Sequence, residues 1–384
     1  MVSSCSCYAI IGIRSHFCII THLTLLLNTY NMMKINEITK TKTIKKLSEL
    51  EKCGLAKTNE LPLLEKVVDQ FSLAISDQMY NAIDHSNPND PIAKQFVPSI
   101  NELNVMPHER EDPIGDAAHT AVNGIIHRYP DRCLFTPVHV CPVYCRFCFR
   151  REKVSSSSAS LSPSELGNAF AYIQEHTEIS EVILTGGDPL ILKPAVLKSL
   201  INRLKEIDHV DVIRIHTRVP VVESHRITPE MIAALKCNKA VYVVLHANHP
   251  NEFTPAASSA CAMFVDAGIP MLSQSVLLKD INNTIDVLSA LMKCFIKNRI
   301  KPYYLHQGDL ARGTQHFRTT IKEGQELVRQ LRGRFSGLCQ PTYVLDIPGG
   351  YGKVPIGPQY LCEHEKNYRV EDYQGDMHHY DVEI

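Results

Sequence analysis

The recurrence of short apolar runs after residue 122 limits the folds open to this chain more than any other feature of its sequence. Amphipathic segments separate the runs; residues 194–207 and 229–238, for example, carry apolar side chains at helical three- and four-residue spacing. The six runs are CLFTPVHV, SEVILTGG, DVIRIHT, AVYVVLHA, PMLSQSVLL and KPYYLHQ. Strands that alternate with helices pair in parallel through right-handed crossovers, and strands this apolar are covered on both faces. The pattern therefore predicts an α/β fold, either a barrel or a doubly wound sheet.

Polar or glycine-containing sequence stands where several of these runs end. The segments are TGGDP, HTRVP, HANHP and HQGDL. In parallel α/β folds, ligands bind at the carboxyl ends of the strands. We therefore expect a site that is assembled from several loops, one after each strand.

The loop after the first run carries three cysteines, Cys141, Cys145 and Cys148, in the stretch HVCPVYCRFCFRRE. A structural zinc site needs a fourth Cys or His nearby, and His139 lies on the expected strand before the loop. The bacterial ferredoxin run has a fourth cysteine and a different spacing. Three thiolates on a four-iron cluster leave one iron without a protein ligand. We therefore predict a 4Fe-4S cluster whose fourth iron is open to a small molecule.

Composition excludes some classes of function. A chain of 384 residues, 44% of them hydrophobic, is long enough to bury a large core. The net charge of -1 and the lack of a sustained basic run argue against a nucleic-acid partner. The 13 cysteines are an odd number spread along a long chain, which is typical of a reducing compartment. We therefore expect a cytoplasmic protein.

The N-terminal residues 1–32 need a separate interpretation. The stretch CYAIIGIRSHFCIITHLTLLLN is apolar, but no small-residue cleavage site follows it, and three basic side chains interrupt it: Arg14, His16 and His22. We interpret residues 1–32 as an upstream mis-start or a disordered extension and expect no membrane association, with a membrane-anchored form as the alternative. Residues 33–120 should form a helical arm, which ends in the acidic loop HEREDPIGD.

The spacing Cys-x3-Cys-x2-Cys, with Phe147 just before the last cysteine, is the signature of radical S-adenosylmethionine (SAM) enzymes. A longer series of segments resembles one family among them, the lysine 2,3-aminomutases. In chain order the series is HRYPDRCLF, CPVYCRFCFRRE, VILTGGDPL, HTRVPVV, SQSVLL, KPYYLHQGDL, SGLCQPTYVLDIPGG and GKVPI. The resemblance implies a partial TIM-like (β/α)6 radical SAM barrel over residues 121–310 and a C-terminal segment, residues 311–384, that carries a cofactor lysine.

The resemblance also implies which residues bind the cofactors. Close backbone approach favours glycine where the methionine amino group of SAM is received. The residues that match the SAM-binding positions are Gly186, Gly187, Asp188, His246 and Gln274. Lys353 matches the lysine that forms a Schiff base with pyridoxal 5′-phosphate. Arg128, Tyr129 and Arg132 match the segment that helps to hold this second cofactor, where arginines suit a phosphate dianion.

Three further matches concern the substrate. Arg150 corresponds to the residue that pairs with the substrate carboxylate, which a guanidinium can bind in a bidentate fork. Asp309 and Asp346 correspond to the pair that receives the side-chain ammonium of lysine. Two carboxylates in one cavity are unfavourable unless a cation joins them. The implied reaction is the conversion of L-lysine to β-lysine, and family members that act on glutamate are not expected to keep both acids.

The chain departs from the family in two places. Well-studied members bind zinc through C-terminal cysteines at a subunit contact, whereas this tail has only Cys362, so zinc is not predicted. His306 stands where many relatives have tyrosine. We still expect a homo-oligomer and a reducing electron donor such as flavodoxin or ferredoxin.

Three alternatives to a free-lysine enzyme stay open. One is a lysine aminomutase that supplies β-lysine for the modification of elongation factor P. The second is a non-catalytic iron–sulfur protein, which would need no aldehyde-binding lysine at position 353. The third is a structural zinc protein, which metal analysis would reveal.

Overall fold

The computed structural model describes residues 43–156, 160–364 and 367–381. The interpretation of residues 1–32, and the first ten residues of the expected arm, therefore lie outside the described residues. Residues 43–384 form one compact unit. The division of this unit into an arm, a barrel and a C-terminal segment remains our proposal. Within the described residues, no helix is both long and apolar enough to cross a membrane.

The arm consists of short helices rather than one long one. Polar caps and prolines divide it: Asp90 accepts hydrogen bonds from the first amides of a helix that begins at Pro91, and Ser76 caps the helix before it. Apolar side chains such as Leu50 and Leu64 are buried against the core. The elements are α2 (Leu47–Lys52), η1 (Thr58–Glu60), α3 (Leu61–Gln70), α4 (Asp77–Ala82), α5 (Pro91–Phe96), η2 (Ile100–Leu103) and η3 (Ala117–His119).

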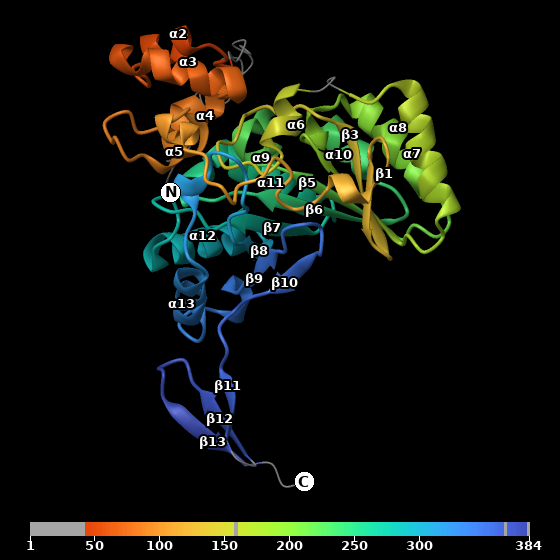
Figure 1. The fold of residues 1–384 in the computed structure, drawn as a ribbon. Coiled ribbons are helices and arrows are strands. Elements are labelled where there is room, and N and C mark those ends of the chain that lie inside the picture. Colours follow the sequence, from red (N-terminus) through yellow and green to blue (C-terminus); the bar gives the residue numbers. More distant parts are fainter. Residues whose placement is uncertain (1–42, 157–159, 365–366, 382–384) are drawn as a thin grey trace, which may run out of the picture. The chain divides into compact units, whose positions relative to one another are not determined.

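A ten-stranded sheet forms the centre of the protein, and its strands follow one another in chain order (Figure 1). The strands are β1 (Thr120–Val122), β2 (Ile125–Tyr129), β3 (Arg132–Val138), β4 (Glu181–Gly186), β5 (Val212–Thr217), β6 (Ala240–His246), β7 (Met271–Val276), β8 (Ile300–His306), β9 (Thr342–Asp346) and β10 (Lys353–Pro355). The six predicted runs are β3 to β8, and they pair in parallel as expected. The sequence reasoning did not anticipate β9, which pairs in parallel with β8. Strands β1, β2 and β10 are antiparallel additions at the two edges.

Helices connect the parallel strands and cover the outer face of the sheet, where α8 packs beside α10 (Figure 1). The helices are α6 (Arg151–Ser156), α7 (Pro163–Glu175), α8 (Pro194–Lys205), α9 (Val219–Val222), α10 (Pro229–Leu235), α11 (Pro255–Asp266), α12 (Ile285–Lys297) and α13 (Ile321–Leu331). Short 3-10 turns lie between them: η4 (Pro189–Ile191), η5 (Ser224–Arg226), η6 (Pro250–Glu252), η7 (Gln315–Phe317) and η8 (Gly337–Cys339). Four of these eight helices, α7, α8, α10 and α11, begin at proline after a polar or extended cap residue, which fixes where those strand connections turn back.

Burial alternates along the strands in a way that locates the site. In β5, Ile213 and Ile215 are fully buried, whereas Arg214 and His216 are only half-buried and line a cavity. Because side chains of a strand point alternately to its two faces, the apolar face packs on the helices and the other face borders the cavity. The second face of the sheet therefore partly borders a ligand cavity, in place of a second layer of helices.

The two edges of the curved sheet meet without a strand ladder. Tyr129, at the end of β2, accepts a hydrogen bond through its hydroxyl from the backbone N–H of Lys353 in β10, at 2.7 Å. Gly115 touches the backbone of Gly350, where an added Cβ would lie 2.5 Å from the Gly350 nitrogen. Side chains and loops close the partial barrel at this seam.

A separate antiparallel sheet follows β10. It contains β11 (Leu361–His364), β12 (Asn367–Glu371) and β13 (Met377–Tyr380). Most of its described side chains are exposed, and an ion pair between Arg329 and Glu371 joins it to α13.

Candidate functional site

One cavity inside the curved sheet contains every site residue that the sequence predicted. Its volume is about 830 Å³, and strands β2 to β10 and the loops after them contribute to its lining. The predicted residues on its wall are Arg128, Tyr129, Arg132, Cys141, Cys145, Cys148, Arg150, Gly186, Gly187, Asp188, His246, Gln274, Asp309, Asp346 and Lys353. The fold therefore brings together groups that are up to 225 positions apart in the sequence (353 − 128). Their individual roles remain predictions.

The cysteine loop is held by the N-terminal arm. The backbone N–H groups of Tyr144 and Arg146 donate to the carbonyls of Ala74 and Gln95, at 2.8 and 2.9 Å. Arg146 is fully buried, and its Nη2 pairs with Glu102 at 2.6 Å. Arg151, just after the loop, pairs with the same carboxylate. A buried carboxylate shared by two arginines is stable only when all three groups stay together, so these contacts fix the loop.

The three thiols lie in surroundings that disfavour free thiolates. Desolvation raises the pKa of Cys141 well above its usual value, and the charges of Asp188 and of the other two cysteines add to this effect. Desolvation and Cys145 raise the pKa of Cys148 to about 11. Three neighbouring thiolates need positive charge among them, and an iron–sulfur cluster supplies it while taking thiolates as ligands. The donor set therefore fits the predicted 4Fe-4S cluster.

Arg218 is a functional candidate that the sequence reasoning missed, although it lies in the quoted segment HTRVP. Its Nη1 donates to the sulfur of Cys145 at 2.9 Å, and its Nη2 donates to Glu252 at 2.8 Å. Although desolvation raises the pKa of Cys145, the charge and hydrogen bond of Arg218 oppose that rise. Gln95 of the arm accepts a further hydrogen bond from Arg218. Arg218 therefore joins the cluster loop to the end of β5.

The predicted SAM-binding segment lies directly beside the cysteine loop. Gly187 approaches the backbone of Val140 so closely that a Cβ would lie 2.2 Å from the Val140 carbonyl oxygen. The Asp188 carboxylate accepts from the hydroxyl of Thr217 at 2.7 Å and from the N–H of Arg218 at 2.6 Å. Asp188 thus joins the loops after β4 and β5, in addition to lining the cavity. Its predicted contact with SAM stays a prediction.

Two more predicted residues lie on β6 and β7. The ring of His246 stacks on Phe147 of the cysteine loop, with 5.7 Å between ring centres. Burial lowers the pKa of His246 well below its usual value, and the nearby charges of Arg218 and His306 act in the same direction. His246 is therefore a neutral imidazole. Gln274 pairs with His246 across the parallel ladder, so both face the same part of the cavity.

Lys353 and the two predicted substrate carboxylates form another part of the cavity wall, called the Lys353 wall below. The Nζ of Lys353 lies 2.7 Å from Oδ1 of Asp346, and Nδ1 of His306 lies 3.4 Å from Oδ2. Desolvation acts to raise the pKa of Asp346, but the hydrogen bond from His306 and the charge of Lys353 outweigh it and lower the pKa to about 2. Burial and the charge of Asp346 raise the pKa of Asp309 to about 7. Asp346 is therefore ionised, whereas the raised pKa of Asp309 leaves its carboxyl group partly protonated until a cation binds beside it.

The remaining predicted cofactor residues line the same cavity as Lys353. Arg132 stacks on the ring of Tyr129, with its guanidinium carbon 3.8 Å from the ring centre, while Nη2 of Arg128 donates to the carboxylate of Asp116 at 3.1 Å. His216, on β5, was not predicted; its Nε2 is buried and has no hydrogen-bond partner among the residues that the structure describes. Nε of Arg128 is likewise buried and unpartnered. Buried nitrogens without partners, in a cavity that also holds a lysine and several arginines, suit an anionic cofactor, so these residues fit pyridoxal phosphate.

Asp116 was also missed, although it is the last residue of the quoted loop HEREDPIGD. It is buried, and it binds two of the predicted arginines: Nη2 of Arg128 at 3.1 Å and Nε of Arg150 at 2.9 Å. Only the folded chain shows this contact, because the sequence places no pattern around Asp116 that sets it apart from the other acids of the loop.

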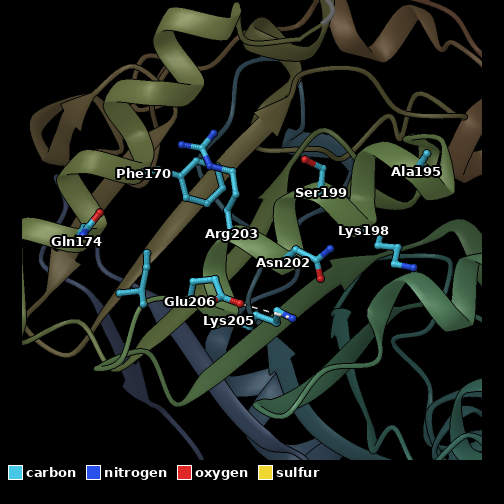
Figure 2. Close-up of a pocket in the computed structure, with 10 residues that line it drawn as sticks. Phe170, Gln174, Ala195, Lys198, Ser199, Asn202, Arg203, Lys205 and Glu206 are labelled. Atoms are coloured by element: carbon cyan, nitrogen blue, oxygen red, sulfur yellow. Dashed lines mark ion pairs between the residues drawn. The ribbon is translucent and has the colours of Figure 1, made fainter.

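A second hollow lies on the outer face of the protein, between α7 and α8. Figure 2 shows its polar side chains, which include Ser199, Asn202 and Arg203. Arg203 covers the ring of Phe170, and Lys205 forms an ion pair with Glu206 at 3.5 Å. No predicted site residue lines this hollow, and exposed pairs of this kind contribute little energy.

Comparison with known proteins agrees with this geometry. The radical SAM superfamily matches residues 135–284, and the C-terminal family described as lysine-2,3-aminomutase matches residues 328–381. The L-lysine 2,3-aminomutase of Acetoanaerobium sticklandii is 39% identical over 88% of this chain and 82% of that protein. The chain belongs to the lysine 2,3-aminomutase family. This membership confirms the predicted fold class, the enzymatic character and the set of cofactors: a 4Fe-4S cluster, SAM and pyridoxal phosphate.

Other relatives of this aminomutase family differ in their named substrate. The L-lysine 2,3-aminomutase of Clostridium subterminale is 39% identical over 84% of this chain and 78% of that protein. The glutamate 2,3-aminomutase of Clostridioides difficile is 37% identical over 89% of this chain and 79% of that protein. Identity alone therefore does not choose between lysine and glutamate, and the choice depends on the site.

Proposed function

We propose that the protein is an L-lysine 2,3-aminomutase, which moves the α-amino group of L-lysine to C3 and yields β-lysine. The observation that carries this proposal is the pair of acids, Asp309 and Asp346, in the same cavity as Arg150 and Lys353. Lysine offers a carboxylate for the arginine and a terminal ammonium for the acids. Glutamate would bring a second negative charge toward them.

The charge states of the two acids support a cationic substrate. Without a bound cation, the pKa of Asp309 lies at about 7, so part of the population keeps a neutral carboxyl group there. An ammonium beside it would favour the ionised form, because an opposite charge stabilises a carboxylate. A unit pair 4 Å apart gains about 4 kcal/mol at an effective dielectric of 20, before desolvation. Half of this gain still exceeds the roughly 1.4 kcal/mol that corresponds to a tenfold preference for one substrate over another.

The chain's own residues bind and orient the substrate. Arg150 receives the carboxylate, and the acids receive the terminal ammonium, so that the lysine chain spans the cavity between them. Lys353 presents its amino group beside Asp346, to which its Nζ donates a hydrogen bond at 2.7 Å. When bound, the cluster with SAM supplies hydrogen abstraction at carbon, and pyridoxal phosphate supplies the carbonyl group that carries the migrating nitrogen. The curved sheet excludes water from the reacting carbon.

The test is a comparison of kcat/KM for lysine, glutamate and ornithine after anaerobic reconstitution. We expect lysine to be preferred over glutamate by well over tenfold. Asp309→Asn and Asp346→Asn should each weaken lysine turnover, while pyridoxal phosphate still binds at Lys353. Comparable turnover of glutamate and lysine, or indifference to both substitutions, would refute lysine as the substrate and leave the family assignment intact.

We further propose the conditions in which the enzyme works. The three thiols must stay reduced to bind iron, which favours the cytoplasm. The cluster needs a one-electron reductant, for which flavodoxin or ferredoxin is the class we propose. A homo-oligomer is also part of this proposal, and size-exclusion chromatography with light scattering tests it.

A further inference from the structure

Residues 110–119 contact three separate parts of the proposed substrate site. The N–H of Arg110 donates to the carbonyl of Leu310, the neighbour of Asp309, at 2.8 Å. Nε2 of His119 lies 2.9 Å from the carbonyl oxygen of Gly350, in the loop that leads to Lys353. Between these two contacts, Asp116 binds both Arg128 and Arg150. One short segment therefore borders the acid pair, the cofactor lysine and the carboxylate-binding arginine.

The segment has a fixed shape of its own. The side chain of Asp112 accepts hydrogen bonds from the N–H of Asp116 at 2.9 Å and of Ala117 at 2.8 Å. The hydroxyl of Thr120 donates to the carbonyl of Asp116 at 3.0 Å. Gly115 has a φ of +69°, which favours glycine, and a Cβ added to it would lie 2.5 Å from the nitrogen of Gly350 and 2.6 Å from the carbonyl carbon of Gly349. Asp116 is thus presented to the arginines by a turn that cannot shift without moving the Lys353 loop.

The contact with Asp116 decides which edge of Arg150 remains for a ligand. Nε of Arg150 is engaged by Asp116, and within the described part of the chain neither Nη1 nor Nη2 of Arg150 has a hydrogen-bond partner. A carboxylate can still bind end-on to these two nitrogens in the bidentate form. Rotation about the last bonds of Arg150 would break its charge-assisted bond to Asp116. The guanidinium is therefore held in one plane, with its free end available.

We infer that Asp116 is a positioning residue that fixes Arg150 for the substrate carboxylate, and that residues 110–119 set the spacing between Arg150 and Lys353. The inference rests on the proposed function. It explains how an α-amino acid can place its carboxylate at Arg150 and its α-nitrogen near Lys353 at the same time. Asp116 acts through Arg150 and does not touch the substrate.

Cadaverine, which is lysine without its carboxylate, separates this role from general stabilisation. We would measure the binding of L-lysine and of cadaverine to the holoenzyme from the change in pyridoxal phosphate absorbance, without turnover. Asp116→Asn should weaken lysine binding at least tenfold and change cadaverine binding less than twofold. Glu223→Gln is the matched control, because Glu223 is also a buried carboxylate paired with an arginine, Arg226, but does not line the cavity. It should leave both affinities unchanged.

Each outcome of this experiment has one meaning. An equal loss for lysine and cadaverine, or no loss for lysine, overturns the inference. If the wild-type protein binds cadaverine but not lysine, the proposed function fails instead. If Asp116→Asn does not fold, Asp116→Glu is the second variant, because it keeps the negative charge but displaces Arg150. It should show the same selective loss of lysine binding, with the iron content unchanged. Equal affinities in Asp116→Glu and the wild type would also overturn the inference.

Gly115 tests the other half of the inference, the contact with the lysine loop. The Cβ of Gly115→Ala would lie 2.6 Å from the carbonyl carbon of Gly349, so the loop must move. We expect pyridoxal phosphate affinity to fall at least fivefold while cluster iron stays constant. Gly357→Ala, four residues after Lys353, is the control, because an added Cβ there meets nothing within 4 Å. Unchanged cofactor affinity in Gly115→Ala would show that residues 110–119 do not set the position of Lys353.

Discussion

The cysteine loop and the Lys353 wall face the same cavity but balance their charges in opposite ways. At the loop, desolvation and mutual repulsion raise the pKa values of Cys141 and Cys148, so the protein alone does not stabilise the thiolates. At the wall, Asp346 already has two partners, Lys353 and His306. The loop is therefore predicted to need its metal cluster for charge balance, whereas Asp346 is already paired before a cofactor binds. Loss of the cluster should disturb the protein more than loss of pyridoxal phosphate.

The largest effect is expected from the cysteines. Replacement of Cys141, Cys145 or Cys148 by Ala should remove most cluster iron and abolish activity, because three thiolates are the complete set of protein ligands predicted for the cluster. Anaerobic iron and sulfide analysis measures this loss. The Lys353 wall should be unaffected, so pyridoxal phosphate should still become fixed at Lys353 after borohydride treatment. A fully active wild type that holds stoichiometric zinc would contradict the cluster.

Lys353→Ala tests the same comparison from the other side. It should abolish activity and the borohydride-stable attachment of pyridoxal phosphate, yet retain the iron content of the wild type. Mass spectrometry of proteolytic peptides locates the attached cofactor. Attachment at another lysine, or a parallel loss of iron, would show that the two walls are not independent.

Asp309 should make the stability of the protein depend on pH, an effect smaller than those expected from the cysteine and Lys353 substitutions. Its pKa rises from 3.8 to about 7 in the folded, cofactor-free protein, so the folded state binds a proton that the unfolded state has lost. The contribution of Asp309 to stability is thus most favourable below about pH 4 and falls as pH rises to about 7. We expect the loss to be roughly 2 to 4 kcal/mol. Denaturant unfolding at several pH values measures it, and Asp309→Asn should remove this part of the slope. Parallel curves for the two proteins would argue against the shift.

Replacement of Arg218 should produce the smallest of these effects, a change in the redox potential of the cluster predicted at the cysteine loop. Its positive charge and its hydrogen bond to Cys145 favour the reduced cluster, because reduction adds negative charge. Arg218→Gln combined with Glu252→Gln removes the ion pair without leaving a buried charge. The midpoint potential should become more negative, with most of the iron retained. An anaerobic redox titration followed by electron paramagnetic resonance reports it, and an unchanged potential would leave Arg218 a purely structural role.

The sequence predicted the parts of the fold that have a local signal. Strands β3 to β8 were predicted because each is a continuous apolar run, which is the strongest sign of a buried parallel strand. Strand β9 was missed because TYVLD is short and was noticed only for its resemblance to the family. The expected arm was broken into short helices by prolines and caps such as Asp90, which periodicity alone does not locate.

For the site, residue types and motifs in the sequence predicted which residues line the cavity, but not the contacts that hold those residues in position. Asp116 meets Arg150 across 34 positions of sequence, and Arg218 meets Cys145 across 73. No spacing rule connects residues so far apart, because their meeting depends on how the whole sheet curves. Asp188 illustrates the converse: the sequence suggested a ligand contact, and the fold also uses its carboxylate to join two loops.

The seam between β2 and β10 has a consequence for local motion. Strands β5 and β6 are joined by a six-residue register, so opening between them must break many hydrogen bonds together. At the seam, the N–H of Lys353 is held by one phenolic oxygen, that of Tyr129. The free energy of opening is therefore lower here than elsewhere in the barrel, and the Lys353 amide should exchange with deuterium well before those of β5. This seam would let a bulky aromatic cofactor enter beside the predicted cofactor lysine while the rest of the barrel stays folded.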